Sequence, residues 1–187
     1  MTAVLAVWIA AGVLGALLLY VVLTFNRLVR NRNRVDNAWS GIDVQLRRRY
    51  DLIPNLIQTV KAYADHERKL FEDVTRARSQ AIEAGTVEQQ AQAENQITRS
   101  LRQLFAVSES YPQLRANENF LALQEELTAT ESKIAFARQF YNDQVQRLNT
   151  LIQQFPSLLV ARPFRFDTRE FFEIEDLQRA PVQVDRE

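Results

Sequence analysis

The stretch "VDNAWSGIDVQLRRRYDLIPNLIQTVKAYA", residues 35–64, decides the fold, because its large side chains recur at alternating steps of four and three. One face of a helix has this period, whereas a strand buries every second residue. The pattern continues past residue 64 and predicts one long helix that ends at Gly85 and is kinked at Pro54. The apolar stripe comprises Val35, Trp39, Ile42, Leu46, Ile53, Leu56, Val60, Tyr63, Leu70, Val74, Ala77 and Ala81, with Arg49 and Glu67 as its two charged positions.

Two further stripes of the same spacing predict two further helices, which are separated by turn-forming residues. Gly85 and the polar residues after it predict a turn and the start of the second helix, and Pro112 marks the next break. Pro156 and Pro163 end the third helix, and residues 168–178 predict a short fourth one. The second stripe comprises Ile97, Leu101, Leu104, Ser108 and Tyr111, and the third comprises Phe120, Leu123, Leu127, Thr130, Ile134, Ala137, Tyr141, Val145, Leu148 and Ile152.

Short connections join these amphipathic stretches, so the most economical arrangement is an antiparallel bundle that buries the stripes against one another. We therefore predict an all-α protein with three parts. Residues 1–26 form a transmembrane anchor, and residues 27–178 form an elongated antiparallel bundle of three long helices and a short C-terminal helix. Residues 179–187 are expected to form an extended or disordered tail.

The anchor is predicted from "AVLAVWIAAGVLGALLLYVVLTF", residues 3–25, which contains no charged side chain. As a helix this stretch is about 34 Å long, which is enough to cross a bilayer core of roughly 30 Å. A cleaved signal peptide would begin with positive charge and have a shorter apolar core, of about 7–15 residues. We therefore expect an uncleaved transmembrane helix.

Four arginines follow this stretch directly, at positions 27, 30, 32 and 34, and no Lys or Arg precedes it. Under the positive-inside rule, Arg27, Arg30, Arg32 and Arg34 place the amino terminus outside and the rest of the chain in the cytoplasm. Attraction to anionic membrane lipids is a second expected role. Binding to nucleic acid is disfavoured, because the chain has 23 basic and 23 acidic residues and no extended face of interleaved basic and aromatic residues.

The composition argues against an enzyme and against a bound cofactor. Cysteine is absent, which excludes disulfides, thiolate catalysis and cysteine metal ligands. His66 is the only histidine, so the paired histidines of zinc-protease and di-metal bundle sites cannot be formed. The chain also lacks a glycine-rich phosphate loop. We expect neither catalytic residues, nor a metal, nor another cofactor.

The first helix is longer than the second can cover, which predicts apolar surface that is left over near the membrane. Such surface usually marks a partner, and anchoring holds all copies in one plane with one orientation. We therefore expect a homo-oligomer, whose contacts include Asn37, Asp43, Gln45 and Arg49. For Arg49 two interpretations stay open: the aliphatic stem packs while the charge reaches solvent, or the charge meets a partner.

Two long segments resemble the LemA family. These are "NRVDNAWSGIDVQLRRRYDLIPNLIQTVKAYADHE", residues 33–67, and "YPQLRANENFLALQEELTATESKIAFARQFYNDQVQRLNTLIQQFP", residues 111–156. The resemblance implies a single-pass protein of the bacterial inner membrane with a cytoplasmic antiparallel helical bundle. It implies no reaction and no catalytic residues, because the family has no agreed biochemical activity. A related protein belongs to the membrane-organising set of magnetosome bacteria, which is consistent with scaffolding.

Two functions therefore compete. The first is a membrane-anchored scaffold that self-associates, and the second is an adaptor or regulator of another membrane protein, such as a membrane protease. An enzyme whose site is built from Glu and Arg side chains is the least favoured, since no nucleophile or base stands out.

The expected orientation can be tested with a reporter phosphatase that is active only after export. Fused after Gln178 in the full chain, the reporter should be inactive, because the arginines that follow the span retain this end in the cytoplasm. The measurement is phosphatase activity in whole cells, normalised to the amount of fusion protein. High activity at this position would reverse the assignment.

Overall fold

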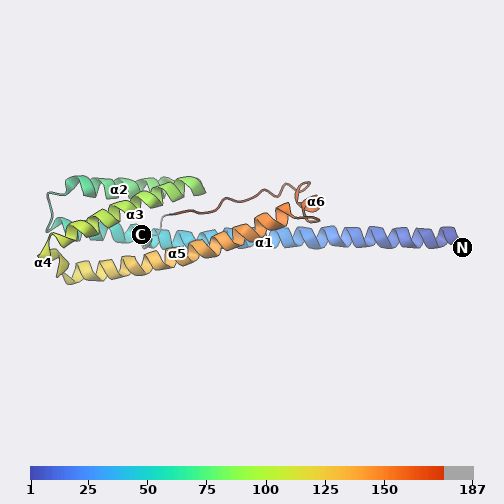
Figure 1. Ribbon diagram of the computed structural model, residues 1–187, viewed down its shortest axis with the longest axis horizontal. Coiled ribbons are helices and arrows are strands. Elements are labelled where there is room, and N and C mark those ends of the chain that lie inside the picture. The colour runs from blue at the N-terminus through green and yellow to red at the C-terminus, as the bar shows by residue number, and fades with distance from the viewer. Residues whose placement is uncertain (175–187) are drawn as a thin grey trace, which may run out of the picture. The chain divides into compact units, whose positions relative to one another are not determined.

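The computed structural model describes residues 1–174, and these residues form helices and connecting segments without any strand. This confirms the all-helical class. Positions 175–178 of the predicted fourth helix and the predicted tail, 179–187, lie outside the described residues. The helices are α1 (Thr2–Lys61), α2 (Arg68–Glu83), α3 (Val87–Glu109), α4 (Pro112–Arg115), α5 (Glu118–Gln153) and α6 (Leu158–Ala161), as labelled in Figure 1.

The chain divides into two compact units. The first consists of Met1–Trp39 and Tyr141–Arg169, and the second consists of Ser40–Phe140 and the segment that begins at Glu170. Helices α1 and α5 contribute to both units, so each unit takes one part of each long helix.

Residues 1–20 of the chain, all but the first of which belong to α1, are exposed. Within residues 1–174, α1 is the one helix that is long and apolar enough to cross a membrane. Burial begins at Thr24, where the first unit starts to cover α1. The structure therefore supports a membrane-associated N-terminal helix, as the charge-free stretch predicts.

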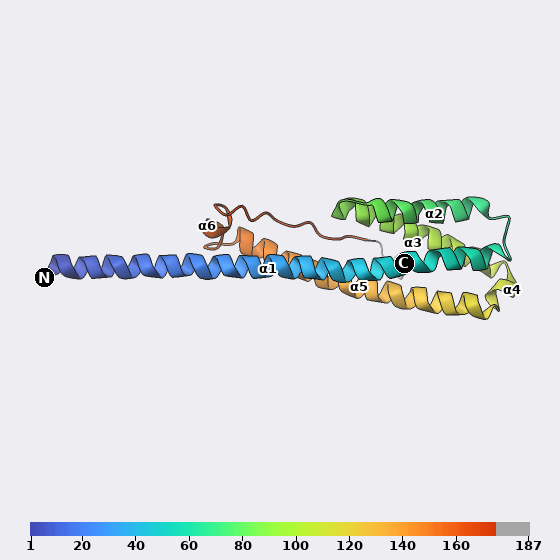
Figure 2. The same cartoon turned by 180° about the vertical axis from the view of Figure 1, so that it is seen from behind.

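The core of the first unit lies between α1, the last part of α5, and α6. Figure 2 shows α6 beyond the end of α5. Trp39 was predicted to be in the core but is only half-buried, and its ring packs edge to face on that of Tyr141, with centroids 5.3 Å apart. The buried side chains include Thr24, Leu28, Val35 and Ala38 of α1, Tyr141, Val145, Leu148, Leu151 and Ile152 of α5, and Val160 and Ala161 of α6.

The turn after α6 is closed by two backbone hydrogen bonds. Phe166 donates to the carbonyl of Ala161 and Arg165 donates to that of Arg162, both at 3.1 Å. These are the bonds of a Schellman motif, and Arg165 occupies its left-handed position with φ 55°. Glycine adopts this conformation more easily, so an arginine here costs on the order of 1 kcal/mol.

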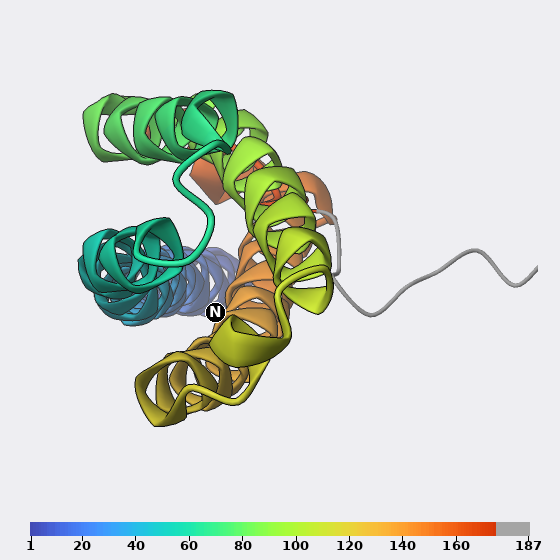
Figure 3. The same cartoon turned by 90° about the vertical axis from the view of Figure 1, so that its left-hand side faces the viewer.

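In the second unit, α2 and α3 form an antiparallel pair that lies against the second half of α1 (Figure 3). Helix α3 begins with a side-chain cap: the amide of Gln89 donates to Oγ1 of Thr86 at 3.1 Å. The Gln89 side chain in turn accepts from the amide of Gly85, also at 3.1 Å. The buried apolar side chains include Ile42, Leu46, Ile53, Leu56 and Val60 of α1, Leu70, Phe71 and Val74 of α2, Ile97, Leu101 and Leu104 of α3, and Phe120, Leu127 and Ile134 of α5, whereas Leu123 is only half-buried.

The prediction of one uninterrupted helix from residue 35 to Gly85 is wrong. Helix α1 ends at Lys61, and residues 62–67 form a turn in which the amides of Tyr63 and Ala64 both donate to the carbonyl of Val60. The reversal lets α2 bury its own apolar face in the second unit, and this packing outweighs the local helix preference of the turn residues.

The predicted helix at residues 168–178 is also wrong where the structure describes it, because residues 168–174 have no regular secondary structure. The side-chain amide of Asn149 replaces the missing backbone partners at one point. It donates to the carbonyl of Arg169 at 2.9 Å and accepts from the amide of Arg169 at 2.8 Å. Farther along, Phe172 is fully buried in the second unit.

Candidate functional site

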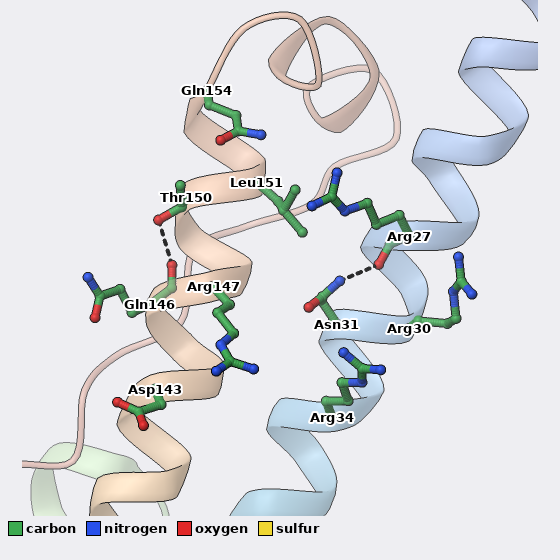
Figure 4. Close-up of a pocket in the computed structure, with 10 residues that line it drawn as sticks. All are labelled: Arg27, Arg30, Asn31, Arg34, Asp143, Gln146, Arg147, Thr150, Leu151 and Gln154. Atoms are coloured by element: carbon green, nitrogen blue, oxygen red, sulfur yellow. Dashed lines mark hydrogen bonds between the residues drawn. The ribbon is translucent and has the colours of Figure 1, made fainter.

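An open cavity of about 770 Å³ lies in the first unit, between the part of α1 that follows the apolar stretch and the last part of α5. Figure 4 shows Arg27 and Asn31 extending from α1 toward α5, and Arg147 extending from α5 toward α1. The lining residues are Arg27, Arg30, Asn31 and Arg34 of α1, and Asp143, Gln146, Arg147, Thr150, Leu151 and Gln154 of α5.

The spacing of the α1 residues explains why they line one cavity. Positions 27, 31 and 34 are separated by four and three residues, so they share one helix face. Asn31 is buried, and its side-chain amide donates to the carbonyl of Arg27 at 2.8 Å, which fixes it against the helix. Arg30 donates to the carbonyl of Asn26 at 3.3 Å and lies at the edge of this face.

The cavity is strongly cationic. Four arginines face one carboxylate, that of Asp143, so the lining carries a net charge of +3. Arg27, Arg34 and Arg147 form no salt bridge within residues 1–174. A concentration of like charges in a hollow attracts anions, and planar guanidinium groups match the geometry of phosphate. The charge and the shape of the arginine side chains therefore suit an anionic group.

Arg32, the remaining arginine of the cluster, lies outside this cavity. Its guanidinium carbon is 5.6 Å from the centre of the Phe166 ring, which is within the range of a cation–π contact. The four arginines that directly follow the apolar stretch therefore divide between the cationic cavity and an aromatic contact.

The residues predicted for self-association occupy different environments. Asn37 is exposed in the first unit. In the second unit Asp43 is half-buried and pairs with Arg47 at 2.9 Å. Gln45 is half-buried too, and its buried Oε1 has no hydrogen-bond partner within residues 1–174. Arg49 is fully buried, so it cannot touch another copy directly.

An exposed apolar surface adjoins Gln45 in the second unit. A shallow groove of about 360 Å³ is formed there by α1 and α5, and Phe136 is 75% exposed at its edge. Phe140, one turn farther along α5, is 50% exposed, and Val44 of α1 is 60% exposed. The groove is lined by Gly41, Gln45, Ser132, Lys133, Phe136 and Ala137.

Arg49 is the centre of a buried ionic cluster. Both Arg49 and Glu94 of α3 have 0% exposed side chains, and they form a salt bridge. The second guanidinium nitrogen, Nη1, lies 2.5 Å from Oε1 of Glu131 of α5. The interior location contradicts both interpretations of Arg49 that its position in the stripe left open, since the charge reaches neither solvent nor a surface.

Tyr50 and Gln90 complete this cluster. The Tyr50 hydroxyl donates to Glu94, and the Gln90 amide donates to the Tyr50 oxygen at 2.7 Å and to Glu94 at 2.8 Å. Burial raises the pKa of Tyr50 to about 12, although the neighbouring Arg49 charge and the Gln90 hydrogen bond both act to lower it. The phenol therefore remains a hydrogen-bond donor to the carboxylate at physiological pH.

The sequence held a signal for Glu94 that the predicted stripes did not use. Glu94 precedes Ile97 by three residues and Leu101 by seven, so it continues the second stripe toward the amino end of α3. A negative charge on that stripe complements the positive charge of Arg49 on the first. Arg147 gave no comparable signal, because only the folded chain brings it to the arginines after the apolar stretch.

Among residues 1–174, no group of three or more His, Cys, Asp or Glu side chains is placed to hold a metal ion. His66 is exposed in the turn between α1 and α2. The cationic cavity and the exposed groove are the two surface features of the described residues on which a function can be argued.

Known proteins are similar in sequence to this chain over most of its length. The model of the LemA family matches residues 38–185. The protein LemA of Metamycoplasma hominis is 25% identical over 164 residues, which cover 85% of this chain and 73% of that protein. The magnetosome proteins MamQ 2 and MamQ 1 of Paramagnetospirillum magneticum are each 22% identical over 188 residues, which cover 87% of this chain and 69% of each relative.

The buried cluster makes a testable prediction about stability. Arg49→Met keeps the aliphatic stem but leaves Glu94 charged and unpaired in the interior, so unfolding should become easier by about 3–5 kcal/mol. Arg48→Met is the matched control, because the neighbouring Arg48 pairs with Glu126 at 2.7 Å on the exposed surface. Arg48→Met should lower the free energy of unfolding by less than about 1 kcal/mol. Denaturant unfolding of the full chain in mild detergent, followed by circular dichroism, measures both.

Adding Glu94→Gln to Arg49→Met should recover part of the lost stability, since it removes the uncompensated charge. If Arg48→Met and Arg49→Met lowered the free energy of unfolding equally, the buried cluster would not contribute the predicted stability.

The raised pKa of Tyr50 predicts a loss of stability in alkaline solution. Tyrosines of the unfolded chain ionise near pH 10, whereas native Tyr50 retains its proton to about pH 12. Between these values the native state binds more protons at this site, so stability falls as the pH rises, by on the order of 2–3 kcal/mol at pH 12. Tyr50→Phe should remove this part of the dependence of stability on pH. Thermal unfolding of both proteins from about pH 9 to about pH 12 tests it, and parallel pH profiles would contradict the prediction.

Proposed function

The chain belongs to the LemA family, and on this premise we propose that it is a membrane-anchored, non-enzymatic helical protein that self-associates into a scaffold. The proposal rests mainly on one observation, the groove of the second unit that is lined by the exposed Phe136 and formed by the helices that also expose Val44 and Phe140. Large aromatic side chains are seldom left in water beside a hollow unless another surface covers them.

The second copy of this chain is the partner that the groove fits best. The first twenty residues of the chain are all exposed, which supports anchoring in lipid. Anchored copies share one plane and one orientation, which raises their effective concentration for a lateral contact. The groove has few charges of its own, with Lys133 as the one ionic residue among its lining, so like copies are not repelled there.

The remaining parts of the proposal concern placement. The arginines that follow the apolar stretch support a cytoplasmic location for the chain after residue 26, with the amino terminus outside the inner membrane. The cationic cavity beyond that stretch supports contact with anionic membrane lipids. The MamQ relatives are named as magnetosome proteins, and a role in organising a membrane is consistent with a scaffold.

An adaptor or regulator of another membrane protein, such as a protease, is the second candidate function. The same exposed groove favours it, because an apolar hollow with one cation can hold a different partner equally well in chemical terms. The two candidates predict different occupants of one surface, so one experiment separates them.

Cysteine cross-linking in native membranes tests the occupant, and the absence of natural cysteine makes the readout clean. A single Phe136→Cys or Gln45→Cys substitution should give a dimer on mild oxidation, since a second copy would bring equivalent residues together. Gln103→Cys, at an exposed position of α3 outside the groove, is the matched control and should not cross-link.

Particle mass in mild detergent gives the second measurement. Phe136→Glu should lower the mass to that of a monomer, whereas Gln103→Glu should leave the oligomer intact. Monomers without cross-links would end the scaffold proposal, and a second protein at fixed stoichiometry would replace it with the adaptor.

A further inference from the structure

The segment 155–166, which includes α6, packs against the end of the charge-free stretch of α1. The ring of Phe164 lies 4.9 Å from that of Phe25, and the ring of Phe166 lies 5.6 Å from it, both in edge-to-face geometry. All of these residues belong to the first unit. We call residues 155–166 the interface loop.

The position of Phe25 sets the level of this loop relative to a bilayer. Phe25 is the last apolar residue before the arginines, and the stretch that it ends is about as long as a bilayer core is thick. When residues 3–25 span a membrane, Phe25 lies where hydrocarbon gives way to headgroups. The side chains that pack on Phe25 must then lie at that same boundary.

The exposed side chains of the loop suit a boundary rather than water. Phe155 is 77% exposed, Leu159 is 64% exposed and Phe164 is 51% exposed. Three large apolar groups on a twelve-residue loop would be costly to leave in water, whereas aromatic side chains are enriched where membrane meets water. The opposite side of α6 is already used, since Val160 and Ala161 are buried in the first unit.

Cations surround these apolar groups. Arg162 and Arg165 are exposed on the loop itself, and Arg32 lies over the ring of Phe166. The cationic cavity adds Arg27 and Arg147 in the same unit. Arg165 also stands at the left-handed position of the turn, where a glycine would fit with less strain. Apolar groups ringed by arginine are typical of segments that lie in the surface of anionic membranes.

We propose that the interface loop is a second membrane contact, which inserts Phe155, Leu159 and Phe164 into the headgroup boundary of an anionic leaflet beside the transmembrane helix. Its arginines bind the phosphates of anionic lipid, and the loop thereby fixes how the first unit meets the bilayer. The inference requires only that residues 3–25 span the membrane, and it holds with or without self-association through Phe136.

Site-specific fluorescence in the full, otherwise cysteine-free chain tests this contact. Leu159→Cys, labelled with an environment-sensitive dye, is reconstituted in vesicles of phosphatidylcholine with roughly a quarter of anionic phosphatidylglycerol. Brominated acyl chains should quench this dye, and it should be shielded from aqueous iodide at least about threefold relative to the control position. The control is Asn33→Cys, exposed on α1 and about 12 Å farther along the helix than Phe25.

Four further measurements complete the test. Phe155→Cys repeats it at an independent site in case one substitution disturbs the fold, and flotation of the vesicles verifies that the chain is inserted. In vesicles of phosphatidylcholine alone, and for Arg162→Gln with Arg165→Gln in anionic vesicles, quenching by brominated lipid should be weaker.

A dye at position 159 that is open to iodide and unaffected by brominated lipid, in chains that float with the vesicles, would overturn the proposal. A second result would overturn it too: a dye that brominated lipid does not quench, but whose shielding from iodide increases with the ratio of protein to lipid. Another protein copy would then cover the loop. Equal quenching with and without anionic lipid would contradict the proposed binding of the arginines to lipid phosphates.

Discussion

The guanidinium of Arg49 has no access to water, so its charge must be neutralised inside the second unit, and this requirement fixes how three helices meet. Glu94 of α3 and Glu131 of α5 supply the negative charge. Each can do so in one register only, because a shift of one residue rotates a helical side chain by about 100°. Apolar stripes tolerate sliding and exchange of similar side chains far better than buried charges tolerate the loss of a partner. The stripes therefore select which faces meet, and the ionic cluster with Tyr50 selects their alignment.

The sequence predicts those parts of the fold that are encoded locally. The stripe from residue 35 to Val60 is buried as predicted except at the half-buried Trp39, and Gly85 and Pro112 mark real helix boundaries, because periodicity and turn chemistry act over a few residues. The turn at residues 62–67 was missed, since it holds neither Gly nor Pro and the four-three spacing runs through it unbroken. Its cause is the packing of α2, which lies outside the segment. Residues 168–174 escaped prediction for the same reason, because a distant asparagine and the burial of one phenylalanine hold them.

The candidate site shows the same division between local and distant information. The arginines that directly follow the apolar stretch are evident from the sequence, because they stand beside the charge change that gives them meaning. Arg147 and the interface loop come from more than a hundred residues away, so no local pattern connects them to Phe25. Together they make the first unit cationic and aromatic where the apolar stretch ends, whereas the second unit offers a nearly uncharged groove. The two units thus present surfaces of different chemistry, which is cationic and aromatic in the first unit and nearly uncharged in the groove of the second.

The make-up of the first unit has a consequence for the order of events during synthesis. Its N-terminal part, residues 1–39, is completed by residues 141–169, and the contiguous part of the second unit lies between them. At about 5–20 residues per second, the ribosome delivers the completing segment on the order of 5–20 s after the N-terminal helix. The second unit can bury most of its core in that interval, while Leu28 and Val35 remain uncovered. A nascent chain that stalls before Tyr141 would keep these side chains exposed, which gives cellular quality control a direct mark of an unfinished protein.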